Sequence, residues 1–87
     1  MELDEDVLAD VVKRLRRVQG QVGGIVQMIE SGRDCKDVIT QLAAASKALD
    51  RSGFKLIASG LEKCVSDGSE QAAADRAQLE KLFLSLA

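Results

Sequence analysis

The sequence predicts an all-α fold. Its 87 residues include no proline and only 2% aromatic residues, and the rest of the composition is dominated by residues that favour helix over sheet. Apolar residues recur at three- and four-residue spacings, which is the period of an amphipathic helix. Without a low-complexity tract or linker, residues 1–87 are expected to form one domain. So short a chain buries a modest core, and we expect it to gain stability as an oligomer.

The first predicted helix runs from Val7 to Ile29. Three glycines inside it lower its intrinsic stability, which suggests close approach of another backbone or local flexibility. Gly32 is a plausible stop, because glycine readily takes the left-handed conformation that ends many helices. The apolar positions of this helix are Val7, Leu8, Val11, Leu15, Val18, Val22, Ile25, Val26 and Ile29.

The second predicted helix spans residues 35 to 65. Asp34 precedes it and can accept hydrogen bonds from backbone N–H groups of the first turn. Glycine weakens a helix interior, so a break at Gly53 into two shorter helices is the main alternative to one continuous helix. The apolar stripe consists of Val38, Ile39, Leu42, Ala45, Leu49, Leu56, Ile57, Leu61 and Val65.

A third, shorter helix is predicted after the turn-forming residues Asp67, Gly68 and Ser69. Its apolar face consists of Leu79, Leu82, Phe83 and Leu86. The sequence therefore predicts a three-helix protomer.

The first residues of the chain and its hydropathy indicate the cellular compartment of the protein. The first six residues are acidic where a signal peptide would be basic, and no apolar run approaches the roughly 20 residues that span a bilayer. We expect a cytoplasmic protein without a membrane partner. In a reducing compartment, two cysteines are seldom a permanent disulfide and are more often buried packing residues, metal ligands or redox-active thiols.

Cys35 and Cys64 lie 29 residues apart. On one continuous helix this spacing puts both on nearly the same face but about 44 Å apart, far beyond the ~7 Å limit for a disulfide. If two copies of the second helix pack antiparallel, Cys35 of one faces Cys64 of the other, and two-fold symmetry generates two such sites. The alternative that both are small buried hydrophobic residues stays open.

The two thiols are expected to differ in chemistry. Cys35 lies in the first turn, where unsatisfied N–H groups and the helix dipole stabilise a thiolate, with Arg33 and Lys36 beside it, and is the candidate nucleophile. Cys64 lies near the opposite end and suits the role of resolving thiol. The chain has no histidine to complete a metal site. Met28 is a conceivable soft ligand, although a lone methionine on an apolar stripe is usually core packing.

The basic residues are concentrated in the middle of the chain. Residues 1 to 10 carry a net charge of −5, residues 11 to 30 carry +3, residues 31 to 60 carry +2 and residues 61 to 87 carry −2. Such asymmetry can present a positive surface to DNA phosphates, although a solvated helix face gives the same count. No helix-turn-helix, zinc-finger or aromatic stacking motif is present. The candidate cations are Lys13, Arg14 and Arg17 on the first helix and Lys47, Arg51 and Lys55 on the second.

Three segments resemble the CsoR/RcnR family of repressors: residues 12–30, residues 34–44 and residues 61–65, with the resemblance extending over about residues 8 to 85. It implies a three-helix protomer, an antiparallel dimer and a tetramer that binds double-stranded operator DNA until an inducer is sensed. It also implies the cross-subunit pairing of Cys35 with Cys64 and DNA contacts by Arg14 and Arg51, the other four cations being weaker candidates.

One position departs from the metal-sensing pattern of that family. Its metal-sensing members carry a histidine four residues before the second cysteine, where this chain has Gly60. The departure resembles the persulfide-sensing, CstR-like branch. This implies a persulfide or polysulfide inducer that links Cys35 to Cys64 of the other subunit, releases DNA and derepresses genes for sulfide detoxification. No cofactor, no resident metal and no enzymatic activity are expected, and the alternative is a Cu(I)-responsive repressor that uses the two thiolates.

Overall fold

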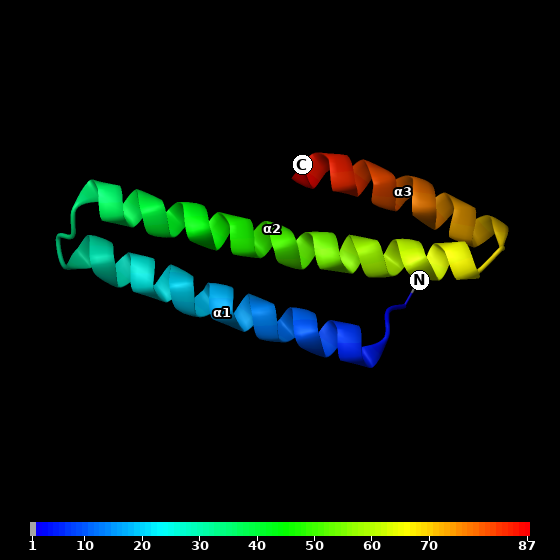
Figure 1. Cartoon of the computed structure of the whole chain (residues 1–87), viewed down its shortest axis with the longest axis horizontal. Coiled ribbons are helices and arrows are strands. Elements are labelled where there is room, and N and C mark those ends of the chain that lie inside the picture. Colours follow the sequence, from blue (N-terminus) through cyan, green and yellow to red (C-terminus); the bar gives the residue numbers. More distant parts are fainter. Residues whose placement is uncertain (1) are drawn as a thin grey trace.

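The computed structural model describes residues 2–87 and consists of three helices joined by short turns (Figure 1). α1 comprises Glu5–Glu30, α2 comprises Cys35–Ser66 and α3 comprises Glu70–Leu86. Residues 2–87 contain no strand, which confirms the all-α prediction. α2 continues through Gly53, so the alternative of two shorter helices is wrong.

Local hydrogen bonds explain where the helices end and begin. Gly32 follows α1 with a φ of 76°, the left-handed conformation predicted for a glycine stop. The Asp34 carboxylate accepts from the backbone N–H of Lys36 at 3.0 Å and caps α2. Before α3, the hydroxyl of Ser69 accepts from the backbone N–H of Ala72 at 3.1 Å. The predicted stop at Gly32, the cap at Asp34 and the turn before α3 are therefore confirmed.

The helices form a single layer with α2 in the middle. α1 and α3 pack against opposite sides of α2 and make no contact with each other within residues 2–87 (Figure 1). The molecule is accordingly flat, with extents of 55 × 25 × 12 Å. Every tertiary contact between helices therefore involves α2.

The buried residues of this layer fall into two groups. In α1 the buried residues recur every seventh position, at Val11, Val18 and Ile25. The other core joins α2 to α3 and consists of Ile57, Cys64, Ala72 and Leu79, with Leu61 packed against it. The rings of Phe54 and Phe83 pack nearby with centroids 5.3 Å apart. Helix α3 therefore covers the C-terminal half of α2.

The N-terminal half of α2 keeps an open apolar face. Ile39, Leu42 and Leu49 are 58%, 50% and 51% exposed, although they belong to the predicted apolar stripe. Helix α3 ends over Gly53, where the side chain of Leu86 approaches α2, and so does not reach them. None of the helices described in residues 2–87 is long and apolar enough to cross a bilayer.

Candidate thiol site and basic surface

The two cysteines lie at opposite ends of α2 and differ in exposure. Cys35 is the first residue of the helix and is exposed, whereas Cys64 is only 9% exposed. Because α2 is continuous between them, 29 residues separate the thiols by about 44 Å along the axis. One chain therefore cannot bring them together, as the sequence predicted.

Cys35 is surrounded by the capping residues of α2. The Asp34 side chain occupies the Lys36 N–H, and Arg33 donates to Asp37 at 3.3 Å. Arg33, predicted to favour a thiolate at Cys35, is thus already engaged with a carboxylate one turn along. The helix N-terminus and the exposed Lys36 remain beside Cys35.

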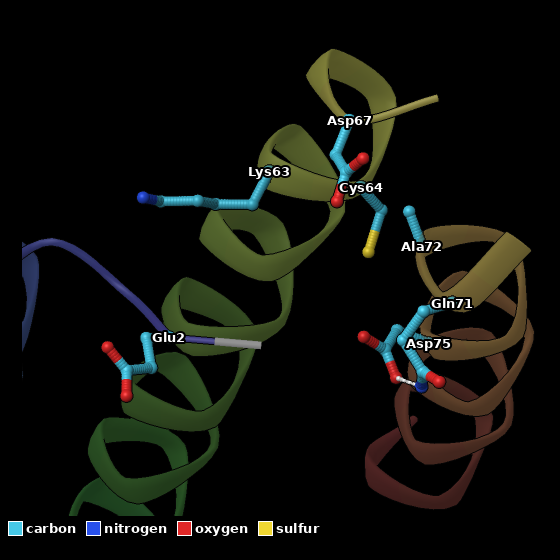
Figure 2. Close-up of a pocket in the computed structure, with 7 residues that line it drawn as sticks. All are labelled: Glu2, Lys63, Cys64, Asp67, Gln71, Ala72 and Asp75. Carbon is cyan, nitrogen blue, oxygen red and sulfur yellow. Dashed lines mark hydrogen bonds between the residues drawn. The ribbon is translucent and has the colours of Figure 1, made fainter. Parts of the chain in front are cut away.

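Cys64 belongs to α2, and its side chain projects into the space between α2 and α3 (Figure 2). It packs in the core with Ala72, so the interpretation of Cys64 as a packing residue holds alongside any chemical role. It also lines two shallow pockets of about 200 and 250 Å³. The smaller one is bordered by the polar residues Glu2, Lys63, Asp67, Gln71 and Asp75. These openings give a reagent or a second chain a path to the sulfur.

The N-terminal segment is attached beside Cys64. Asp4 forms an ion pair with Lys63 at 2.9 Å, and this carboxylate raises the pKa of Lys63 above 10.5. Glu2 lines the smaller pocket at Cys64, and Leu3 lines an apolar groove between α2 and α3. Sequence patterns did not reveal this arrangement, because residues 2–4 precede the helix and have no periodicity to read.

The cysteines are not part of a complete metal site within the part of the chain that the structure describes. Residues 2–87 contain no group of three or more His, Cys, Asp or Glu side chains placed to hold a metal ion. The whole chain also lacks histidine. The two thiols, about 44 Å apart along α2, therefore do not belong to one such group within residues 2–87.

Three of the predicted cations converge on one concave surface between α1 and α2. Arg14, Arg17 and Arg51 line a pocket of about 210 Å³, together with Gln21 and Ala48. Three guanidinium groups around a small hollow suit a phosphate group, which arginine binds through paired hydrogen bonds. Gln21 and Ala48 were not predicted, because neither carries a charge. We refer to these five residues as the arginine notch.

The other predicted cations lie outside the arginine notch. Lys13 and Lys47 are exposed and do not line it. Lys55 forms an ion pair with Asp10 at 3.0 Å, and the same Asp10 oxygen accepts from Nε of Arg14 at 2.9 Å. These two cations lower the pKa of Asp10 to about 2. Asp10 was not predicted, although its i,i+4 spacing to Arg14 was visible in the sequence.

Comparison with known families gives a match over nearly the whole chain. Residues 8–85 match the family described as metal-sensitive transcriptional repressor. The nickel-responsive transcriptional regulator InrS has a similar structure, with a TM-score of 0.80 and 27% sequence identity, over 95% of this chain and 97% of that protein. The three-helix fold is thus shared with a regulator of known structure.

Two curated relatives carry copper in their names. The copper-sensing transcriptional repressor RicR of Mycobacterium tuberculosis is 48% identical over 54 residues, which cover 62% of this chain and 56% of that protein. The copper-sensing transcriptional repressor CsoR of Bacillus subtilis is 32% identical over 72 residues, 83% of this chain and 71% of that protein. The match thus spans little more than half the length of RicR.

Proposed function

Because this chain belongs to the family of metal-sensitive transcriptional repressors, we propose that it represses transcription by binding operator DNA and releases the DNA when Cu(I) binds to a cysteine pair shared between subunits. A protein that binds operator DNA acts in the cytoplasm, the compartment expected from the sequence. The observation that carries the proposal is the position of one exposed and one buried cysteine at opposite ends of a single 32-residue helix.

The arginine notch supports the DNA-binding role. Arginine side chains that line a phosphate-sized hollow fix the position of a DNA backbone, and each phosphate contact adds to the salt dependence of binding. Arg17 and Arg51 form no ion pair within residues 2–87 and are available to phosphate. We therefore assign Arg14, Arg17 and Arg51 as the main phosphate contacts, with Lys13, Lys47 and Lys55 at the periphery.

An antiparallel dimer supplies the second cysteine. Packing the open N-terminal half of α2 against a second copy covers Ile39, Leu42 and Leu49, which removes apolar surface from water. The exposed Cys35 then approaches Cys64 of the partner subunit through the shallow pockets described above. Leu82 and Leu84 remain exposed on α3 and offer apolar surface for assembly of dimers into a tetramer.

The donor set fits Cu(I) better than other transition metals. Two thiolates form a soft, low-coordinate site, which suits Cu(I), whereas nickel and zinc sites draw on imidazole, which this chain lacks, or on further ligands grouped around the metal, and residues 2–87 contain no such group of three or more. The names of RicR and CsoR point to the same ion. Because Cys64 belongs to the α2–α3 core, a ligand that engages its sulfur disturbs the packing of α3 and can alter the relative placement of the helices.

A second candidate inducer is a low-molecular-weight persulfide. It is favoured by the absence of histidine and by Gly60 at the position of the family's histidine ligand. In this scheme the Cys35 thiolate takes the outer sulfur of RSSH, and RSH leaves. Cys64 of the partner subunit then attacks the Cys35 sulfur, HS⁻ leaves, and a disulfide remains. The copper-sensing relatives favour the Cu(I) proposal over this one.

One binding experiment separates the two inducers. A duplex selected from a random-sequence pool is bound to the protein and followed by fluorescence anisotropy during addition of Cu(I) or of glutathione persulfide. Stoichiometric release by Cu(I), lost in Cys35→Ser and Cys64→Ser but retained in Met28→Leu, supports the proposal. Release by the persulfide alone, with a reducible cross-linked dimer on a gel, contradicts it in favour of the second candidate.

A further inference from the structure

One carboxylate lies within the basic surface and holds cations from two helices. A single oxygen of Asp10, Oδ2, accepts from Nε of Arg14 on the same helix at 2.9 Å and from Nζ of Lys55 on α2 at 3.0 Å. Arg14 is also part of the arginine notch. Asp10 therefore links the notch to the lysine at its periphery.

We propose that Asp10 is an internal competitor of DNA phosphate that limits how many cations of this surface the DNA can engage. The inference rests on the DNA-binding function proposed above and adds a residue that sets its strength. A phosphate oxygen and the Asp10 carboxylate offer the same ligand to Lys55, an anionic acceptor at hydrogen-bond distance. Pairing of Lys55 with a DNA phosphate therefore competes with its ion pair to Asp10.

The competition is selective among the cations. Arg17, Arg51, Lys13 and Lys47 form no ion pair within residues 2–87, whereas Arg14 and Lys55 are both engaged by Asp10. Arg14 uses only Nε for this contact, so the donors on its two terminal nitrogens are not used by Asp10. Lys55 has a single charged nitrogen, so Asp10 reduces the attraction of Lys55 to DNA more strongly than that of Arg14.

The exposure of the cluster makes the competition reversible. The side chains of Asp10, Arg14 and Lys55 are 40%, 45% and 38% exposed, so water and salt screen both ion pairs. A carboxylate in such a place weakens DNA binding without abolishing it. Asp10 remains ionised at neutral pH, because its pKa lies at about 2.

The test compares two variants with the same change in charge. Asp10→Asn retains the shape of the side chain and an oxygen acceptor for Arg14, but removes the charge. Asp6→Asn is the matched control, because Asp6 is exposed on the same helix and forms no ion pair within residues 2–87. We would measure binding to a labelled mixed-sequence duplex over a series of KCl concentrations. A duplex of about 30 base pairs is long enough for several phosphate contacts. Thermal unfolding of each variant checks the fold.

The proposal expects Asp10→Asn to bind the duplex about threefold to tenfold more tightly than Asp6→Asn at low salt. The slope of log K against log salt should steepen by about one, because one more cation reaches a phosphate. In a Lys55→Gln background, this steepening should disappear.

Three results overturn the inference. Equal binding by the two variants excludes competition, and weaker binding by Asp10→Asn shows that Asp10 positions the cations for DNA. Undiminished steepening in Lys55→Gln excludes the role of Lys55. If the unsubstituted protein fails to bind duplex DNA at low salt, the proposed function itself is wrong, and that outcome is distinct from the other three.

Discussion

The two halves of α2 carry the same kind of apolar face, yet only one of them is covered within the chain. Helix α3 buries Ile57 and Cys64, while Ile39 and Leu42 stay about half exposed. α3 has 17 residues and α2 has 32, so α3 can cover only about half of its neighbour. Because α3 folds back from the C-terminal end of α2 and is too short to reach the N-terminal end, Cys64 is buried and Cys35 is exposed. Two thiols on the same face of one helix therefore differ in solvent exposure because of tertiary packing.

The largest effect is expected from a change in the covered half. Leu79→Ala should lower the free energy of unfolding by about 2–4 kcal/mol, because it removes most of a buried side chain from the α2–α3 core. Gln78→Ala is the control on the same helix, since Gln78 is exposed and should change stability by less than about 0.5 kcal/mol. Urea denaturation measures both. Equal losses would contradict the assigned core.

The next prediction compares the two thiols directly. In a short pulse of iodoacetamide, Cys35 should be alkylated at least about ten times faster than Cys64, because Cys35 is exposed and Cys64 reacts only through its pockets or after local opening. Mass spectrometry of the digested protein gives both rates. At concentrations where a dimer forms, Cys35 should also become protected. Similar alkylation rates of Cys35 and Cys64 at all protein concentrations would contradict the predicted difference between the two thiols.

The sequence predicted one apolar stripe on α2 but not its division into a covered and an open half. The helices and their caps follow from periodicity and from residues such as Asp34 and Gly32, whose conformational preferences are local. Where α3 docks depends on contacts between residues distant in sequence, and no periodicity encodes that. For the same reason, Asp10 was missed while its partners Arg14 and Lys55 were found.

A smaller effect is expected from releasing the N-terminal segment at the covered end. Asp4→Asn removes the ion pair with Lys63 and should increase alkylation of Cys64 a fewfold, without a change at Cys35. Because the raised pKa of Lys63 keeps it protonated below pH 10.5, the ion pair contributes at neutral pH and is lost as the pH rises through that raised value. Glu5→Gln is the control, since Glu5 forms no ion pair within residues 2–87. Equal rates in both variants would show that the segment does not shield Cys64.

The smallest effect is expected at Gly53, on the boundary between the two halves. A Cβ added there would lie 2.8 Å from Cδ1 of Leu86, so the Leu86 side chain must move away from its contact with α2. Alanine also favours helix over glycine by about 0.5–1 kcal/mol, and the two contributions should nearly cancel in Gly53→Ala. At Gly20, which has open space around it, Gly20→Ala should instead stabilise by the full amount. Urea denaturation gives the free energy of unfolding of both variants and of Gly53→Ala combined with Leu86→Ala. The double variant isolates the contribution of the contact between residue 53 and Leu86. If Gly53→Ala stabilises as much as Gly20→Ala, then the Leu86 side chain moves at no cost and its packing at Gly53 does not contribute to stability.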